Sequence, residues 1–211
     1  MANTTKKKRT VRKSKGANKD KILDAARSLF CNRGFHGTSI RDIAKQAGVS
    51  LGNLYNHYSG KEKLFAALLE RYEEEYFNPE NPLPQAFLAA PFPENIEAIG
   101  NASQETIRRF SDYILLIYVD VVEFQGRYIG TLFRGMHARY EKHLAVTNGK
   151  AARGLAKDID PAAAMMMVTL SFFNYFIVER LFGVRKHFGK SDKEMIDLFA
   201  RVYRYGLTPR K

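Results

Sequence analysis

The sequence predicts an all-α protein of about nine helices, with a small N-terminal domain and a larger C-terminal one. Apolar residues recur at helical spacing along most of the 211 residues. Helix-capping residues precede several of these segments, and glycine or proline separates them. A chain of this length can bury two cores of unequal size. We expect a disordered basic tail over residues 1–18, a first domain over 19–70 and a second over 71–211.

The first two predicted helices each show one apolar face. The first covers residues 18–33, and its apolar residues follow the i, i+3, i+4, i+7 pattern. These residues are Ile22, Ala25, Ala26, Leu29 and Phe30. The second is capped at Thr38 or Ser39, because Asp42 follows Ser39 by three positions in a capping-box pattern. Gly48 is expected to end it.

The third and fourth predicted helices follow without a long loop. Ser50 can cap a short third helix in which Leu54 and Tyr58, four residues apart, lie on one side. A fourth helix begins at Ser59, with Glu62 three residues later in a second capping-box pattern. The second and third helices, joined by a short turn with glycine, form a helix-turn-helix arrangement.

The third helix carries side chains that suit DNA better than a core. They are Ser50, Leu51, Gly52, Asn53, Tyr55, Asn56 and His57. Asparagine can pair with adenine edges, hydroxyl groups reach bases or phosphates, leucine can touch a thymine methyl group, and glycine lets the helix approach the groove floor. Gly52 and Asn53 are also poor helix formers, so helix stability does not explain them. The alternative is a small surface helix in a generic bundle.

The positive charge lies in the N-terminal third of the chain. Residues 1–70 contain fifteen Lys and Arg against five Asp and Glu, and residues 71–211 contain nineteen against seventeen. The two parts therefore carry +10 and +2 of the net charge of +12. This excess favours a polyanionic partner. A basic-tailed helical scaffold for acidic proteins or membrane surfaces, or a tail that only keeps the chain soluble, remains an alternative.

The segment "ILDAARSLFCNRGFHGTSIRDIAKQAGVSLGNLYNHYSGKEKLFAALL" resembles the DNA-binding domain of the TetR family of bacterial transcriptional regulators. The resemblance spans about residues 19–69. It implies that Thr38 contacts phosphate, that residues 50–56 contact bases and backbone, and that Tyr55, His57 and Lys61 clamp phosphates. Asn56 departs from the family, whose members often have an aromatic residue there.

The predicted DNA-binding set combines these arguments. It consists of Thr38, Ser39, Arg41, Ser50, Leu51, Gly52, Asn53, Tyr55, Asn56, His57 and Lys61. Arg41 and Lys61 would flank the groove, and the helix N-termini at Thr38 and Ser59 would offer free amides to phosphate. By the resemblance, the protein is expected to be a transcriptional regulator, with a family tendency toward repression.

The remainder of the chain is predicted to form further helices after a proline-rich connector. Five prolines interrupt residues 78–94, which leaves room for one short helix at most. Helices are expected over 95–110, 112–125, 127–147, 160–183 and 191–206, with a turn near Asn148 and Gly149. Asp160 and Pro161 form an N-cap and first-turn pair, and Ser191 with Glu194 forms a capping box.

The last two predicted helices are expected to form a homodimer interface. Helix 160–183 is apolar over more than one stripe, so one side would face the core and another a partner. In the TetR family the corresponding helices of two subunits form a four-helix interface, and the resemblance implies the same arrangement here. A two-fold axis would place two recognition helices on successive major grooves of a pseudo-palindromic operator.

The second domain is expected to bind a small effector. Aromatic and polar side chains on its helices could line an apolar cavity, although each could equally be ordinary core. They are Phe110, Tyr113, Tyr118, Phe124, Phe133, His137, Phe172, Phe173, Asn174 and Phe176. By the resemblance, a small and apolar inducer would release the protein from DNA, with residues 72–84 as the transmitting segment.

Other function classes find little support in the sequence. The five histidines show no metal-ligand spacing, and neither a phosphate-binding loop nor a nucleophile elbow occurs, so we expect no enzyme, no metal and no cofactor. The single cysteine, Cys31, is expected to be a buried reduced thiol. We see no signal peptide and no apolar run long enough for a membrane span, the nearest being Met165–Val178, and expect a cytoplasmic protein without membrane contact.

Overall fold

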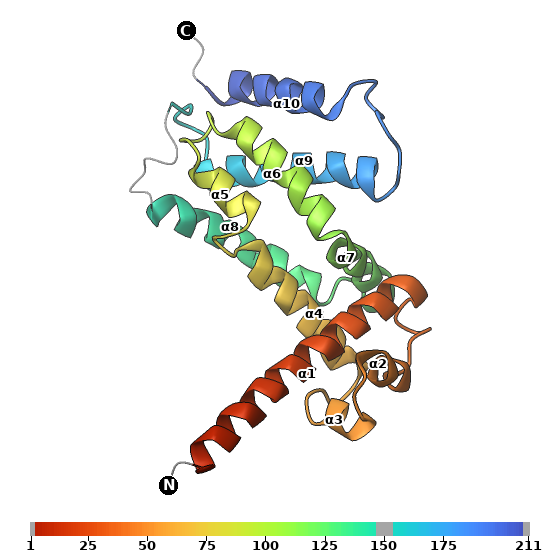
Figure 1. Ribbon diagram of the computed structural model, residues 1–211. Helices are drawn as coiled ribbons and strands as arrows, with labels where there is room; N and C mark the ends of the chain where they lie inside the picture. The colour runs from red at the N-terminus through yellow and green to blue at the C-terminus, as the bar shows by residue number, and fades with distance from the viewer. Residues whose placement is uncertain (1–2, 147–153, 209–211) are drawn as a thin grey trace. The chain divides into compact units, whose positions relative to one another are not determined.

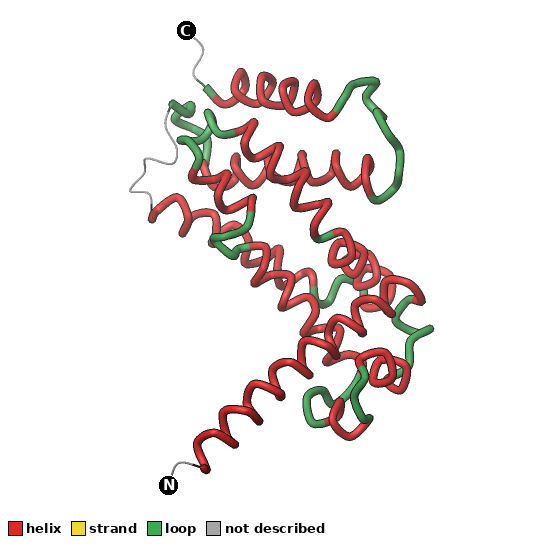
Figure 2. Tube along the Cα trace, in the orientation of Figure 1, coloured by secondary structure: helices red, strands yellow, loops and turns green. Residues whose placement is uncertain are grey.

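The computed structural model describes residues 3–146 and 154–208, and these contain ten α-helices (Figure 1). Figure 2 shows the described residues as helices and connecting loops, without a strand among them. The all-α prediction is therefore confirmed. The predicted turn at Asn148 and Gly149 lies outside the described residues.

The chain folds into two compact units, each of which consists of two separate stretches of the sequence. The first unit comprises the chain up to Tyr72 together with Asp112–Ile129. The second comprises Glu73–Ser111 and the chain from Gly130 onward. The predicted boundary after residue 70 lies close to the first division, but the return of residues 112–129 to the first unit was not predicted.

The first unit contains four complete or nearly complete helices and the beginning of a fifth. They are α1 (Asn3–Arg33), α2 (Ile40–Ala47), α3 (Leu51–Tyr55), α7 (Ser111–Phe124) and the first part of α4 (Lys61–Tyr76). The apolar residues predicted to face inward on α1 are all buried. Phe30, Ile43, Leu54 and Phe65 are fully inaccessible and join α1, α2, α3 and α4 in one core.

The helix ends around the turn follow the predicted capping chemistry. Ser39 caps α2 with a complete capping box to Asp42, and Gly48 ends the helix in the left-handed conformation with φ of 67°. The side chain of Ser50 accepts a hydrogen bond from the Asn53 amide and caps α3. The predicted box from Ser59 to Glu62 is not among the capping boxes of the described helices, since α4 begins later, at Lys61.

Helix α1 begins at Asn3, within the segment predicted to be a disordered tail. Lysine and arginine are good helix formers, and no proline interrupts residues 1–18. Adding residues to an existing helix is easier than nucleating a new one, so the helix over residues 18–33 can extend upstream. The structure differs from the prediction at this point.

Helix α7 packs on the first unit through aromatic side chains. The ring of Phe124 lies 4.7 Å from that of Phe35 and 5.0 Å from that of Phe65, measured between centroids. Nearer the start of α7, Tyr113 stacks on Tyr72 at 5.6 Å. These contacts explain why a segment forty residues beyond Tyr72 completes the core of the first unit.

The second unit contains the remaining helices. They are α5 (Pro82–Leu88), α6 (Ile96–Arg109), α8 (Ile129–Val146), α9 (Pro161–Arg180) and α10 (Asp192–Leu207). Helix α6 packs against α5, α9 and α10. Gly100 allows its approach to α9, because a Cβ atom there would lie 2.9 Å from the ring of Phe172. The caps predicted at Asp160 and Ser191 are both confirmed.

Helix α9 is long and apolar enough, by length and composition alone, to cross a membrane, with a mean hydropathy of 1.6. Half of this segment is buried inside the chain. Its buried side chains include Met165, Phe172 and Phe176.

Candidate nucleic-acid interface

The N-terminus of α2 presents free backbone amides beside a short capping motif. The Asp42 carboxylate accepts hydrogen bonds from the amide and hydroxyl of Ser39, at 3.2 and 2.5 Å. The Asp42 amide in turn donates to the Ser39 hydroxyl at 3.1 Å. These bonds from Ser39 hold the pKa of the Asp42 carboxyl below its ordinary value. The preceding amides of the first turn have no intrahelical acceptor and are available to an anion.

Helix α3 divides into a buried anchor and an exposed face. Leu54 is fully inaccessible and Tyr58, just beyond the helix, is also buried. On the other side, Leu51 and Asn56 are exposed, and Tyr55 exposes 51% of its surface. Burial also raises the pKa of the Tyr58 phenol to about 12, so this residue stays neutral and anchors the helix. The exposed face is therefore free to contact a partner.

Gly52 and Asn53 are placed as a groove-reading surface requires. A Cβ atom added to Gly52 would meet no atom of the chain within 4 Å, so packing inside the protein does not require glycine there. The amide group of Asn53 has a buried side-chain oxygen without a hydrogen-bond partner. An unpaired oxygen of this kind costs free energy unless a further group satisfies it.

A hollow of about 670 Å³ opens beside the start of α2. It is lined by His36, Gly37, Thr38, Ser39, Ile40, Arg41, Asp42, Tyr55 and Lys61. The structure thus brings together five of the residues predicted to bind DNA, namely Thr38, Ser39, Arg41, Tyr55 and Lys61. Helix α3 carries the other six, from Ser50 to His57, on its length and immediate ends. The hollow combines cations, hydroxyl groups and free amides, as a phosphate subsite does.

Lys61 is already engaged within the protein. Its ammonium donates a hydrogen bond of 2.7 Å to the carbonyl oxygen of Phe35. The same group lies 4.4 Å from the centroid of the Phe35 ring, which is a cation–π contact. A lysine at the first position of a helix faces the positive end of the dipole, which is an unfavourable place for a cation unless an anion binds nearby.

The structure shows a contact of Thr38 within the chain that was not predicted. Its side chain is buried, and its hydroxyl donates a hydrogen bond of 2.9 Å to the carbonyl oxygen of Gly34. Thr38 therefore stabilises the turn between α1 and α2, and the residue also lines the hollow. Ser39, one residue later, is exposed and is the actual cap of α2.

Sequence reasoning missed His36 and Glu123. His36 lines the hollow, and its Nε2 atom lies 2.8 Å from a carboxylate oxygen of Glu123 on α7. The contact ties the turn before α2 to a helix that is far away in the sequence. No local pattern could reveal it, because the two residues are separated by more than eighty positions.

The residues predicted to line an effector cavity are distributed over both units. Tyr113, Tyr118 and Phe124 belong to the first unit, and the other seven belong to the second. Among those seven, Phe110, Phe172, Phe173 and Phe176 are buried, His137 is half-buried, and Phe133 and Asn174 are exposed. The ring of Phe172 packs against that of Phe199 at 5.2 Å, as an ordinary core residue does. An effector site built from these ten residues stays a prediction.

The residues that the structure describes contain no group of three or more His, Cys, Asp or Glu side chains that could hold a metal ion. Cys31 lies on α1, where its thiol donates to the carbonyl oxygen of Asp112 at 3.3 Å. Burial, together with the nearby Asp112 carboxylate, raises the pKa of the Cys31 thiol to about 11. The thiol is therefore protonated at neutral pH, as an inert structural cysteine is.

Comparison with known families points to the same region. Residues 22–68 match the family described as "Bacterial regulatory proteins, tetR family". The HTH-type transcriptional repressor KstR2 of Rhodococcus jostii (strain RHA1) is 31% identical over 109 residues, which cover 52% of each chain. The chain therefore matches only about half the length of this curated relative.

Solved structures share the fold over nearly the whole chain. A TetR family transcription regulator from Marinobacter aquaeolei VT8 has a TM-score of 0.67 at 16% identity, covering 94% of this chain and all of the other. The regulator FadR from Bacillus subtilis, solved in complex with stearoyl-CoA, has a TM-score of 0.64 at 15% identity, covering 89% of this chain and 98% of the other. At these identities the likeness establishes the fold alone.

Proposed function

We propose that the chain, whose residues 22–68 match the TetR family of bacterial regulators, is a DNA-binding transcription factor rather than an enzyme, and that it represses transcription at a pseudo-palindromic operator. In this proposal α3 enters the major groove and α2 crosses the DNA backbone. We also propose that the protein acts in the cytoplasm, without membrane contact.

The single observation that carries the proposal is the arrangement around the hollow at the start of α2. Cations from α2 and α4, the free amides of α2 and the hydroxyl group of Tyr55 converge there. The neighbouring face of α3 is exposed and carries polar side chains that its own fold does not use. Phosphate contacts would set the register of the protein on DNA, and Leu51, Gly52, Asn53 and Asn56 would read base edges.

Fluorescence anisotropy with the purified protein tests the proposal. The duplex upstream of the protein's own gene is titrated beside a random duplex at two salt concentrations. We expect a preference of about a thousandfold or more for the specific duplex. Equal, steeply salt-dependent binding to both duplexes that is lost when residues 1–18 are deleted would instead identify a scaffold held by its basic tail.

Homodimerisation through α9 and α10 forms part of the proposal. The outer face of α9 carries apolar side chains at helical spacing that are exposed or half-buried, and so does that of α10. They are Met167, Leu170, Ile177, Val178 and Leu181 on and just after α9, and Leu198, Val202 and Tyr205 on α10. Such a surface is more apolar than an isolated chain keeps in water, and a two-fold pair would cover it.

We assign effector binding to the second unit, with a small and largely apolar ligand that carries a hydrogen-bonding group. The hydroxyl groups of Tyr76 and Tyr140 lie 3.2 Å apart inside this unit, and Tyr140 also bonds to Thr169. Phe87 and Phe173 pack their rings against Tyr140 and Tyr76, respectively. FadR, which shares the fold, was solved with stearoyl-CoA, so acyl-CoA thioesters are the first compounds to try.

The effector proposal is tested by release of operator DNA in an acyl-CoA series of increasing chain length. We expect Tyr140→Phe to leave operator affinity unchanged and to raise the half-releasing concentration by about tenfold, the cost of about one lost hydrogen bond. A phenylalanine variant that responds like the wild type would remove Tyr140 from the effector site.

A further inference from the structure

The connection between α9 and α10 presents a concentration of apolar and basic side chains. Residues 181–191, which we call the arm, contain three cations, Arg185, Lys186 and Lys190, and no carboxylate. Phe182 and Phe188 expose 57% and 58% of their surfaces, and Val184 is also exposed. Large apolar side chains gathered on one exposed segment commonly mark an interaction surface.

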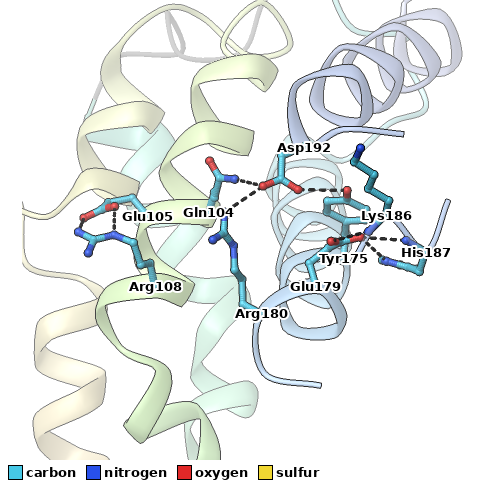
Figure 3. A network of polar contacts seen from close by, with 9 residues as sticks. All are labelled: Gln104, Glu105, Arg108, Tyr175, Glu179, Arg180, Lys186, His187 and Asp192. Carbon is cyan, nitrogen blue, oxygen red and sulfur yellow. Dashed lines mark hydrogen bonds and ion pairs between the residues drawn. The ribbon is translucent and has the colours of Figure 1, made fainter. Parts of the chain in front are cut away.

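The arm is held in one conformation by a buried carboxylate. Glu179, 1% exposed near the end of α9, accepts hydrogen bonds from the backbone amides of Lys186 and His187 at 2.9 and 3.1 Å. Its carboxylate also lies 2.7 Å from Nδ1 of His187, whose ring stacks on Tyr175 at 5.0 Å. Figure 3 shows these groups converging on Glu179.

These bonds outweigh the cost of burying the carboxylate. Burial by itself raises the pKa of the Glu179 carboxyl. The hydrogen bonds from the two amides and the imidazole lower the pKa by more than burial raises it, so the pKa lies below its ordinary value. Glu179 is therefore ionised at neutral pH. The bonds also hold Lys186 in a left-handed conformation with φ of 53°, which is rare for a residue with a side chain.

A second set of polar contacts fixes the far end of the arm. The Asp192 carboxylate, at the start of α10, accepts hydrogen bonds from Arg180 at 2.9 Å and from the Tyr175 hydroxyl at 3.4 Å. Gln104 on α6 also donates to Asp192 (Figure 3). Both ends of the arm are thus anchored to the second unit. A loop ordered before it meets its partner loses less conformational entropy on binding.

The partner is identified by position and by charge. The arm continues directly from the apolar outer faces of α9 and α10. In a two-fold pair whose axis crosses α9, the two copies of that helix run antiparallel, so the end of one meets the start of the other. Asp158 is exposed just before α9, and the carboxylate of its N-cap, Asp160, is about half exposed. Residues 154–160 carry these two carboxylates against one cation, the exposed Lys157, and their small negative charge complements the basic arm.

We propose that the arm packs against the N-terminal end of α9 in a second copy of the chain, with Phe182 and Phe188 as apolar anchors and Arg185 facing Asp158. This inference rests on the proposed homodimer and adds to it a contact that the outer faces of α9 and α10 do not provide. In this proposal the hydrogen bonds between Glu179 and residues 186 and 187 hold Phe182 and Phe188 in a fixed position for binding.

Sedimentation equilibrium of the full chain over a range of concentrations tests the arm. Phe182→Ser combined with Phe188→Ser should raise the dimer dissociation constant by at least about tenfold, because both anchors are lost. Leu88→Ser is the matched control: Leu88 is 61% exposed on α5, outside the arm, and its change should leave the constant unaltered. Unfolding by urea verifies that all variants fold.

A charge exchange tests the orientation. Arg185→Glu should weaken the dimer, and adding Asp158→Lys in the same chain should restore it. Failure of the second change to restore the dimer would overturn the proposed contact with the start of α9.

Two further outcomes separate the arm from the dimer. A dimer that forms with the same constant in the double serine variant would overturn the arm and leave the dimer standing, whereas a wild-type chain that stays monomeric would overturn both. An unchanged constant, accompanied by binding to anionic lipid vesicles that the double serine variant loses, would assign the arm to a lipid surface instead.

Discussion

The ammonium of Lys61 makes two contacts with Phe35. It donates a 2.7 Å hydrogen bond to the carbonyl oxygen of Phe35, and it lies 4.4 Å from the centre of the Phe35 ring. The α1–α2 turn thus positions a cation at the edge of the hollow beside the start of α2. Because the bond to Phe35 uses only one of three ammonium protons, the others remain available to a phosphate oxygen.

Lys61→Ala should therefore weaken binding to operator and random DNA by similar factors. Removing one phosphate contact should also reduce the slope of log affinity against log salt by about 0.9. Anisotropy titrations at four salt concentrations measure both effects. Lys63→Ala is the control, since Lys63 is exposed two residues further along the same helix and does not line the hollow. A loss confined to the operator would contradict a phosphate role.

Gly52→Ala should separate folding from DNA binding. A methyl group at this position meets no atom of the chain, and alanine is the better helix former by up to about 1 kcal/mol. The free energy of unfolding should therefore stay equal or rise, while operator affinity falls, because the methyl group would enter the groove. Urea unfolding and anisotropy measure the two quantities, and undiminished operator binding would show that α3 does not approach DNA at Gly52.

Asn53→Ala should relax specificity more than it weakens binding overall. Loss of one base contact costs about 1–3 kcal/mol of discrimination. The quantity to measure is the ratio of the affinity for the operator to the affinity for a random duplex. The random duplex serves as the control for sequence-independent binding. Equal losses on both duplexes would argue against base reading by Asn53.

Phe124→Ala should destabilise the first unit although Phe124 lies far from α1–α4 in the sequence. Its half-buried ring packs against Phe35 and Phe65, and losing these ring contacts should cost about 1–3 kcal/mol. Val122→Ala, on the same helix but 80% exposed, should stay within about 0.5 kcal/mol of the wild type. The free energy of unfolding from urea titration decides the matter, and similar values for both variants would mean that α7 does not complete this core.

The capping box at α2 should respond to acid. Bonds from Ser39 lower the pKa of Asp42 in the folded chain, so its stabilising contribution is present above the ordinary value of 3.8 and is lost as pH falls through the lowered value. Amide hydrogen exchange at the start of α2 should rise over that range. In Asp42→Asn this local rise should disappear, and its persistence would place the titrating group elsewhere.

Local chemistry in the sequence predicts most of the fold. The caps at Ser39, Ser50, Asp160 and Ser191 were predictable because a capping side chain bonds to an amide three residues away. Contacts between residues distant in the sequence leave no such pattern. The placement of α7 on the first unit therefore could not be read from the sequence alone.

The candidate site shows the same division. The exposed polar face of α3 was predictable from its composition, and the buried position of Leu54 from its spacing to Tyr58. The burial of the Thr38 hydroxyl depends on the path of the chain around Gly34, which spacing does not describe. Aromatic residues predicted to line one cavity are divided between two units, because hydrophobicity identifies buried residues without identifying their neighbours.

The assembly of the first unit from two stretches of chain constrains how the protein is made. Residues up to Tyr72 leave the ribosome before α7 does, so the faces of Phe35 and Phe65 that Phe124 covers stay open in the growing chain. The first unit can reach its final packing only after Ile129 has left the exit tunnel. A chimeric regulator cut at residue 72 would carry the same defect permanently, and exchange of DNA-binding units between relatives must transfer residues 112–129 as well.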